Sequence, residues 1–600
     1  QRMEPGGLPG VIPVAGLMPA LVPGMVDAGL LALQKFGTRP FAEVIAPAAE
    51  LAAGMPLDET RAAAIARSRK FLEQWPSSRR VFLPGGSPPA VGTVFRQPDL
   101  ARTLHAMAAA EKRALEGGRS RADAIQAVRD FFYRGEIARR IGDFSRGHGG
   151  LLRYEDLAAF RLELEEPVSA TYRGCEVFKP GFWSQGPAMI QTLNLIEGFD
   201  LRAMGRNSPA YIHTVVEALK LAYADRDTYY GDPKFADVPA ARLLSKEYAA
   251  GRRALIGPRA SLEFRPGEAG SGSGRHPSRS AAARLDIDEA LMARDTTCVT
   301  AADRDGILFA ATPSGAWLPS VIAGDTGIPL TQRAQSFLLI PGHPNELAGG
   351  KRPRITLSPA LVTRGGRPLL VLSTPGGDNQ DQSLLQLLLN VAEFGMNAQA
   401  AVEAPRFQTR HLVSSFDNHA MSPGELLIDE RLAPTAFEAL AGRGHKLQTR
   451  SRWSSGAVAI NATSCTTRPG ESSANRTPFC NGTLTVRRMK SRSRAPLSTN
   501  HRFSTAEVCS RWISSAHRSA TPPSPPREWQ RKTRRRLRLR RRVRLADPRQ
   551  RIQHRRRAGS RRPHPVHRLP TQRLDQQRQR RPHLRREKPR RFPSDHHPVV

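Results

Sequence analysis

A short stretch, Asp295-Thr296-Thr297, stands where a Gly-, Ser-, Pro- and Arg-rich segment ends and a β-branched segment begins. This arrangement suits self-cleavage, because the Thr296 hydroxyl can attack the Asp295 carbonyl carbon and form an ester that water hydrolyses. Cleavage leaves Thr296 with a free α-amino group, whose pKa is ordinarily about 7.7–8 and which can accept the proton of the hydroxyl. The stretch predicts an N-terminal nucleophile with its own base, although the same residues are common at ordinary strand starts.

A second candidate group is the glycine pair Gly376 and Gly377, between a predicted strand at 368–374 and a predicted helix at about 382–394. Glycines at such a junction let backbone N–H groups approach a ligand closely, with the positive end of a helix dipole behind them. Donors of this kind can stabilise the oxyanion of a tetrahedral intermediate. A plain tight turn is the alternative interpretation.

The secondary structure predicted around these groups changes along the chain, from mainly helices before the segment 258–283 to mainly strands after it. Residues 1–255 are interpreted as helices and loops, with helical spacing in 100–141 and 208–226. Residues 258–283 are rich in Gly, Ser, Pro and Arg and predict a solvated linker. Two short β-branched runs then flank a turn at 303–306 and predict a β-hairpin. Helices with one apolar face beside a β-rich region predict a layered α/β body.

Seven stretches, taken in order, resemble the gamma-glutamyltransferase family. HTVVEALKLAYADRDTYYGDPKFADVP (213–239) is similar to the end of that family's large subunit, and RDTTCVTAADRDG (294–306) to the start of its small subunit. The others are ATPSGAW (311–317), GDTGIPLTQRAQSF (324–337), KRPRITLSPALV (351–362), TPGGDNQDQ (374–382) and EAPRFQT (403–409). The similarity extends from about Gly6 to about Trp453, and each motif alone is modest.

This resemblance implies a four-layer αββα N-terminal-nucleophile hydrolase fold and an acyl-enzyme mechanism that needs no cofactor. It implies a large subunit at 1–295 and a small subunit at 296–455, which cleavage between Asp295 and Thr296 separates. Thr296 matches the family's nucleophile, and the hydroxyls of Thr312 and Ser314 match positions that support it. Either hydroxyl could instead make an ordinary turn hydrogen bond.

The same resemblance implies the remaining site residues. Gly376 and Gly377 match the glycines of the family's oxyanion hole, and Thr356 matches a serine that binds the substrate α-carboxylate. Gln335 falls where an acidic residue binds the substrate α-amino group. Asp378 lies close to the glycine pair and is predicted to bind substrate, with a solvated surface charge as the alternative.

Three departures from the family pattern affect these expectations. Cys298 replaces the histidine that usually stands two residues after the nucleophile. Gln335 is a neutral amide where the family has an acidic residue, so it cannot make a charge-assisted bond to the substrate α-amino group. The arginine that clamps the substrate α-carboxylate in the family is expected before Gln1. After Trp453 the family continues with closing strands, where this sequence becomes rich in arginine. The ATPSG and RAQ variants resemble an acylase-like bacterial branch, which makes substrates other than glutathione plausible.

The net charge of +37 is concentrated at one end of the chain. Residues 461–600 contain 38 Lys and Arg against 7 Asp and Glu, so the remaining residues carry a net +6. Residues 456–600, called here the Arg-rich tail, lack hydrophobic periodicity. The tail has 35 Arg and 3 Lys, a bias that favours out-of-frame translation of a GC-rich gene. A disordered arm that binds nucleic acid non-specifically through 531–590 is the alternative.

Other patterns limit the function classes further. The five cysteines form no CxxC pair and have no zinc-ligand spacing, so neither a metal site nor a disulfide framework is expected. No stretch approaches the about 18 consecutive apolar residues of a membrane span. The sequence begins at Gln1 without an initiator methionine or signal peptide, which leaves cytoplasmic, periplasmic and secreted locations open.

Four hypotheses therefore remain. The leading one is an enzyme that cleaves γ-glutamyl amides such as glutathione through a Thr296 ester and transfers the acyl group to water or an amine. A glutaryl- or cephalosporin-type amide acylase would use the same nucleophile with a different acyl pocket. An inactive fragment that binds nucleic acid through its tail, and a pseudoenzyme that folds without cleaving, are the others.

Overall fold

The computed structural model describes residues 12–270, 296–303, 306–316, 318–416 and 419–451, and the backbone of 459–462. Asp295, the second half of the predicted linker and nearly all of the Arg-rich tail lie outside the described residues. The cleaved bond, the nucleic-acid arm and the out-of-frame hypothesis therefore stay predictions.

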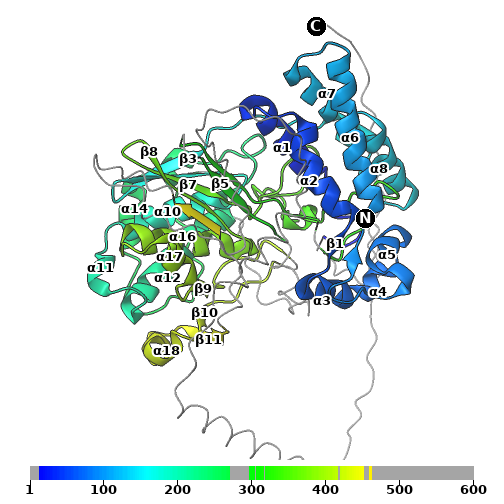
Figure 1. Cartoon of the computed structure of the whole chain (residues 1–600). Helices are drawn as coiled ribbons and strands as arrows, with labels where there is room; N and C mark the ends of the chain where they lie inside the picture. The colour runs from blue at the N-terminus through cyan, green and yellow to red at the C-terminus, as the bar shows by residue number, and fades with distance from the viewer. Residues whose placement is uncertain are drawn as a thin grey trace, which may run out of the picture. The chain divides into compact units, whose positions relative to one another are not determined.

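The main sheet is antiparallel and has the order β12-β8-β7-β4-β3 (Figure 1). Its strands are β3 (Val168–Tyr172), β4 (Cys175–Lys179), β7 (Ala360–Arg364), β8 (Arg367–Ser373) and β12 (Ala459–Ala462). β3 and β4 precede the predicted cleavage point and the other three follow it, so both predicted subunits contribute to one sheet. β12 lies within the range interpreted as the tail, where its backbone pairs with β8.

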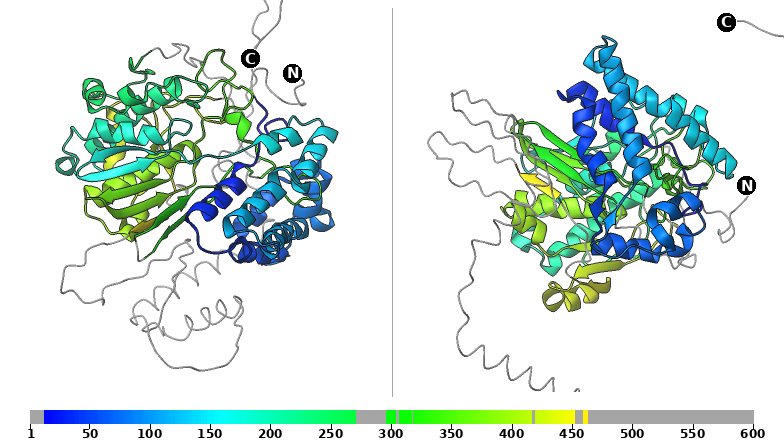
Figure 2. Two further views of the ribbon diagram at one scale, coloured as in Figure 1. Left: turned by 90° about the horizontal axis from the view of Figure 1, so that it is seen from above. Right: turned by 45° about the vertical axis from the view of Figure 1, so that its right-hand side comes forward.

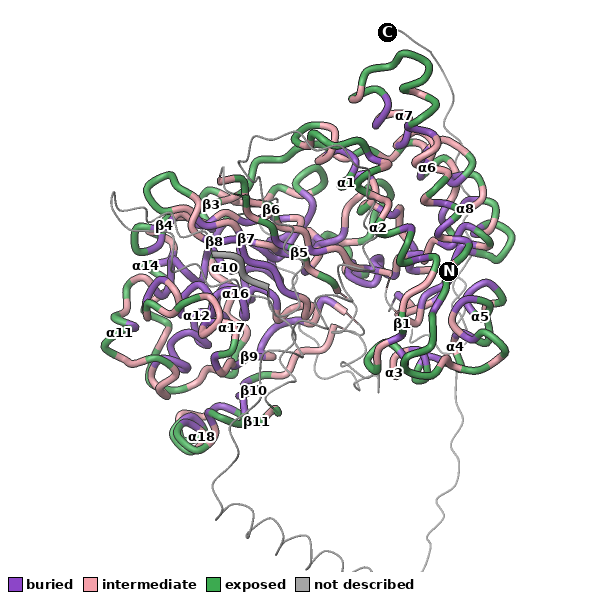
Figure 3. The backbone as a smooth tube through the Cα atoms, in the orientation of Figure 1, coloured by how far each residue is buried: buried purple, intermediate pink, exposed green. Residues whose placement is uncertain are grey.

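Helices cover one face of the main sheet. Val177, Val362 and Leu370 pack into one hydrophobic core with α10 (Gly186–Ile196), α12 (Pro209–Tyr229) and α16 (Gln380–Ala392). Figure 3 shows these helices as largely buried. Because side chains alternate along a strand, the odd-numbered residues at the end of β8 point to the opposite face. That face holds the site described below.

The predicted β-hairpin is confirmed, as β5 (Val299–Ala302) pairs antiparallel with β6 (Leu308–Ala311). A third sheet contains β9 (Phe407–Thr409), β10 (Glu425–Asp429) and β11 (Lys446–Arg450) in the order β11-β10-β9. In sequence, α17 (Ala398–Glu403) precedes β9, and α18 (Ala433–Gly442) lies between β10 and β11.

The N-terminal helices gather in one group around two further cores (Figure 2). The helical spacing at 100–141 corresponds to α6 (Pro98–Glu116), α7 (Arg121–Tyr133) and α8 (Glu136–Gly147). The other N-terminal elements are α1 (Gly24–Phe36), α2 (Phe41–Ala53), β1 (Met55–Pro56), α3 (Glu59–Arg67), α4 (Arg69–Leu72), α5 (Pro76–Phe82), β2 (Val94–Phe95) and α9 (Tyr154–Ala159). The chain also forms α11 (Leu201–Met204), α13 (Ala240–Leu243) and α14 (Lys246–Arg253). Among the helices described, none is both long enough and apolar enough to cross a bilayer.

Two sequence interpretations differ from the structure. The helix predicted at 208–226 is α12, but all of its residues from Tyr211 to Tyr229 are buried, because partners within the fold satisfy its polar side chains. Within the predicted linker, residues 258–270 form no helix or strand but are bonded to α12. Tyr229 donates a hydrogen bond to the Gly267 carbonyl at 2.6 Å, and Lys220 donates to the Ser261 carbonyl at 3.0 Å. Buried donors of α12 thus fix a segment that has few apolar groups of its own.

Candidate active site

The predicted nucleophile lies directly opposite Ser314. β5 and β6 pair in a register that sets Val299 against Ala311, and extending this register by three residues sets Thr296 against Ser314. Thr297 N–H accordingly bonds the Pro313 carbonyl at 3.2 Å. The Oγ1 of Thr296 lies 2.9 Å from the Oγ of Ser314, and both residues are partly exposed. A hairpin turn of suitable length therefore brings together two hydroxyls that are distant in sequence.

The predicted supporting residue Thr312 has a different partner. Its Oγ1 lies 2.6 Å from the Oγ of Ser373, the last residue of β8, and the side chain is buried. This bond fastens the end of β6 to the end of β8, on the sheet face opposite the helices. Thr312 thus positions the hairpin beside the turn that follows β8, and Ser373 is a site residue that sequence reasoning missed.

Gly376 and Gly377 form that turn. Gly377 is also the first residue of η3 (Gly377–Asn379), which α16 follows directly. Their φ angles are 126° and 55°, a region that L-residues with side chains avoid. Asn379 N–H bonds the Gly376 carbonyl at 2.9 Å, and the Gln185 side chain donates to the Gly377 carbonyl at 3.2 Å. These bonds fix the orientation of the peptide groups. A Cβ on Gly377 would lie 2.9 Å from Phe416 Cε2, so the turn requires glycine for space as well.

Asp378 holds this turn in place through bonds to both carboxylate oxygens. Arg226 lies 2.5 Å from Oδ1, Ser415 Oγ donates to Oδ1 at 2.6 Å, and Ser415 N–H donates to Oδ2 at 2.9 Å. Burial alone raises the pKa of Asp378, but Arg226 and Ser415 outweigh it and lower the pKa. These bonds make Asp378 a support of the turn and not a solvated surface charge, and its substrate-binding role remains a prediction.

Arg226 is the second residue that sequence reasoning missed. It is fully buried on α12, where it pairs with Asp227 at 2.7 Å as well as with Asp378. It donates to the Val413 carbonyl at 2.6 Å, and its guanidinium lies 4.6 Å from the centre of the Tyr223 ring. The arginine within AYADRD was the available signal, but no local pattern indicates that it reaches the glycine turn.

Two predicted substrate-binding residues are buried. Thr356 follows Ile355, whose N–H bonds the Trp183 carbonyl at 3.0 Å. Gln335 lies in η2 (Arg333–Ser336), and its Nε2 donates to the Gln332 carbonyl at 3.1 Å. Among the described residues, neither side chain bonds Thr296. Their substrate-binding roles remain predictions.

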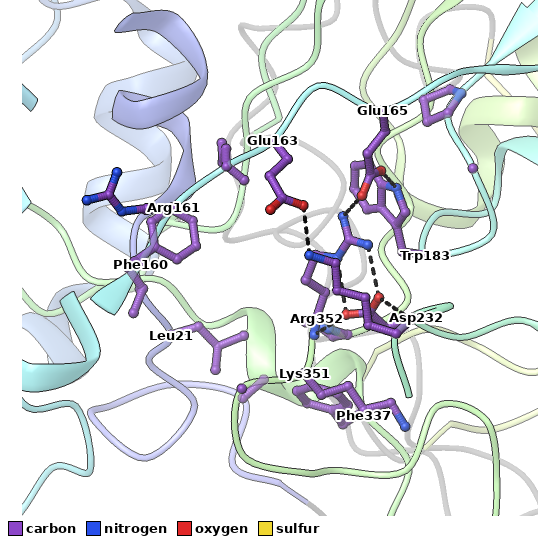
Figure 4. Close-up of a pocket in the computed structure, with 18 of the residues that line it drawn as sticks. Leu21, Phe160, Arg161, Glu163, Glu165, Trp183, Asp232, Phe337, Lys351 and Arg352 are labelled. Atoms are coloured by element: carbon purple, nitrogen blue, oxygen red, sulfur yellow. Dashed lines mark hydrogen bonds and ion pairs between the residues drawn. The ribbon is translucent and has the colours of Figure 1, made fainter. Parts of the chain in front are cut away.

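A cavity of about 1500 Å³ lies alongside β6 and η2 (Figure 4). Leu21, Phe160 and Phe337 belong to its apolar wall, while its other wall carries the ion pair between Arg352 and Asp232 at 2.9 Å. Thr296, Ser314 and the glycine turn are not part of the lining, so this cavity is separate from the nucleophile.

His213, Glu217 and His445 bring possible metal-ligand atoms within 4.8 Å of one another. However, Lys220 already lies 2.5 Å from the Glu217 carboxylate, and Arg265 lies 3.2 Å from it. The two cations compensate the charge of Glu217, which disfavours a divalent ion at this position.

A threonine ahead of the β5–β6 hairpin, a hydroxyl beside it and a glycine turn after β8 agree with the N-terminal-nucleophile class of hydrolases. The structure is similar to that of cephalosporin acylase from Bacillus halodurans, with a TM-score of 0.59, 28% identity and 74% of each chain covered. The chain belongs to the gamma-glutamyltranspeptidase family, whose model matches residues 4–476.

Proteins of known activity agree with this assignment. The chain is 33% identical to the acylase ACY 1 proenzyme of a Pseudomonas strain, over 74% of this chain and 72% of that protein. It is 31% identical to the glutathione hydrolase proenzyme of Escherichia coli, over 71% of this chain and 68% of that protein. The family confirms the predicted enzyme class, an N-terminal-nucleophile hydrolase and acyltransferase, and the predicted fold.

Proposed function

We propose that this chain cleaves itself before Thr296 and then cleaves γ-glutamyl amides of the glutathione type through an ester on Thr296 Oγ1. The observation that carries this proposal is the 2.9 Å contact between Thr296 Oγ1 and Ser314 Oγ, set by the hairpin register. The contact places a hydrogen-bonding hydroxyl beside the nucleophile, next to a turn rich in backbone donors.

In the proposed reaction the α-amino group of the released Thr296 takes the proton from its own Oγ1. Oγ1 attacks the amide carbonyl carbon, and the backbone N–H groups of Gly376 and Gly377 stabilise the oxyanion. The C–N bond then breaks, and the leaving amine takes the proton. Water or an amine attacks the ester, takes the acyl group and returns the proton to Thr296.

We also propose that the two subunits stay associated after cleavage. The main sheet joins β4 from one side of the cleavage point to β7 from the other through antiparallel backbone pairing. Leu370 and Leu372 of β8 pack into the same core as α10 and α12. Separating the subunits would expose this core and break the β4–β7 ladder, so association is favoured strongly.

A glutaryl- or cephalosporin-type amide acylase is the second candidate. It is favoured by the neutral side chain of Gln335 and by the bonds that already occupy both oxygens of Asp378, since a γ-glutamyl ammonium group needs an anion. Comparing kcat/KM for γ-glutamyl p-nitroanilide and glutaryl p-nitroanilide separates the two candidates.

Self-cleavage is tested by intact mass and denaturing gels of the parent and a Thr296→Ala variant. The parent should split into residues 1–295 and 296–600, and the variant should stay whole. Thr297→Ala is the matched control, because this exposed neighbour should not be needed for cleavage. An uncleaved parent would support the pseudoenzyme or inactive-fragment hypothesis. Salt-dependent DNA binding that disappears when 531–590 is removed would support the nucleic-acid role of the tail.

A further inference from the structure

The cavity alongside β6 and η2 takes no part in the proposed reaction, because its lining does not include Thr296, Ser314 or the glycine turn. Its volume of about 1500 Å³ exceeds that of an ordinary small-molecule site, which is about 300–1000 Å³. Figure 4 shows Leu21 and Phe160 across the cavity from Arg352. Four further leucines of the lining are exposed: Leu151, Leu164, Leu339 and Leu347. Exposed apolar side chains around an apolar cavity indicate that it binds an apolar group.

The charged side chains of the opposite wall are mostly paired with one another. Arg352 lies 2.9 Å from Asp232 and 2.6 Å from Glu165. Lys234 lies 2.8 Å from Glu163. Each of these two cations has a carboxylate of the protein beside it, so neither requires an anion from a ligand.

Lys351 is the exception on this wall. Among the described residues, its ammonium group contacts no carboxylate directly and donates no hydrogen bond. The side chain is half-buried, and its nitrogen lies 5.8 Å from the centre of the Phe235 ring. Burial lowers the pKa of Lys351, while the more distant carboxylates of Glu346 and Asp232 act in the opposite direction. Lys351 is therefore a partly dehydrated cation beside an apolar cavity.

Other features of the cavity limit the kind of ligand. Arg161 and Glu166 of its lining are exposed, so water already screens their charges. A peptide would bring backbone N–H and C=O groups into the cavity, and each of them needs a hydrogen-bond partner that an apolar wall does not offer. An alkyl chain needs no such partner. An anionic head group beside Lys351 would replace the water that burial removes from the ammonium group.

We propose that this cavity is a second ligand site, which binds an alkyl chain with a single anionic head group, such as the anion of a fatty acid. The apolar wall holds the chain and Lys351 binds the head group. Because a lysine ammonium is a point charge, it does not distinguish planar from tetrahedral head groups, and the ligand class is defined by its charge and its chain. This inference does not rest on the proposed function, because the site shares no residue with the Thr296 site.

The test compares decanoate, decanol and decylammonium, which share one alkyl chain and differ in head-group charge. Binding is measured by calorimetry in a Thr296→Ala background, so that every sample is a single uncleaved species. Decanoate should bind about 10-fold more tightly than decanol, the lower end for a hydrogen bond to a charged group, because Lys351 is only half-buried. Decylammonium should bind most weakly. Octanoate should bind about 10-fold more weakly than decanoate, because it buries two fewer methylene groups.

Substitutions in the lining test which residues form the site. Lys351→Met keeps a side chain of similar length and should remove the preference for decanoate over decanol, whereas Lys351→Arg should keep it. Ala348→Trp places a bulky ring at an exposed position of the lining and should weaken binding of both ligands. Lys70→Met removes an exposed lysine of α4 and is the matched control, which should change neither affinity. The melting temperature of each variant shows whether it has folded.

The inference would be overturned if decanol or decylammonium bound as tightly as decanoate, if Lys351→Met kept the preference, or if none of the ligands bound. In a parent that cleaves itself, decanoate should also leave KM for γ-glutamyl p-nitroanilide unchanged. Competitive inhibition would instead place the ligand in the Thr296 site and contradict a second site. Failure of self-cleavage or of turnover would contradict the proposed function alone, because the binding measurements need neither.

Discussion

Asp378→Asn tests whether α12 holds the Gly376–Gly377 turn through a buried ion pair. The substitution keeps the size of the side chain and an oxygen that can accept from Ser415. It removes the negative charge that lies 2.5 Å from Arg226. The expected result is a less stable protein in which the Gly376–Gly377 turn is no longer held in place.

The magnitude follows from the charges of the buried network. Arg226 and Arg354 both pair with Asp227, at 2.7 Å and 3.0 Å. Burial, together with repulsion from Arg226, lowers the pKa of Arg354 to about 10. In the parent two guanidinium groups face two carboxylates, whereas Asp378→Asn leaves two cations with one carboxylate. Breaking a buried pair in this way costs about 3–5 kcal/mol, and the retained Ser415 bonds favour the lower end.

The assay is urea unfolding at pH 7, followed by tryptophan fluorescence, in a Thr296→Ala background that keeps the chain in one piece. Asp143→Asn is the matched control, because Asp143 is exposed and lies 3.9 Å from Arg146. Removing such a surface pair costs less than about 1 kcal/mol. The buried network would not have the role described here if Asp378→Asn and Asp143→Asn unfolded at the same urea concentration.

The pH dependence gives a second check on the same residue. The folded-state pKa of Asp378 is lower than its ordinary value. Its contribution is therefore complete above the unfolded pKa of about 3.9 and is lost as the pH falls through the folded pKa. The stability difference between the parent and Asp378→Asn should thus be constant near neutral pH and should shrink below about pH 4.

Three further predictions concern the site and its surroundings. Ser314→Ala should slow both self-cleavage and ester formation about 10-fold, the value of one hydrogen bond, as single-turnover mass spectrometry would show; unchanged rates would exclude a supporting role. Gly377→Ala should lower kcat at least about 100-fold, because the turn cannot accept a Cβ, whereas Gly395→Ala, also at positive φ but in open space, should keep full activity. Burial lowers the pKa of His343 to about 4, so the unfolded chain binds more protons than the folded chain between about pH 6.5 and 4. The free energy of unfolding should therefore decrease as the pH is lowered from about 6.5 to 4. In urea titrations, His343→Gln should make this pH dependence weaker.

Much of the catalytic strand could be predicted because its geometry is local. The β-branched runs around 303–306 predict a hairpin, and the register observed in the structure sets Thr296 opposite Ser314. The strand, glycine pair and helix at 368–394 likewise follow from local composition and correspond to β8, the turn and α16.

The supporting contacts could not be predicted, because they join segments that are distant in sequence. Thr312 bonds Ser373, which the sheet order brings beside the hairpin. Residues 258–270 look like a linker by composition, yet buried donors on α12 hold them. The hydrophobic periodicity of α12 predicts one buried face. It does not indicate that the polar residues of this helix are buried as well, because their partners come from distant segments.

The sequence by itself determined the family to which the chain belongs, the hairpin at 299–311 and the candidate nucleophile Thr296, since these depend on residue types and short spacings. Tertiary structure alone decided that Asp378 holds the Gly376–Gly377 turn through Arg226. The physical reason is that a charged group acquires its role from the partners that folding places around it. Those partners come from α12 and from the segment before β10, which meet only in the folded chain.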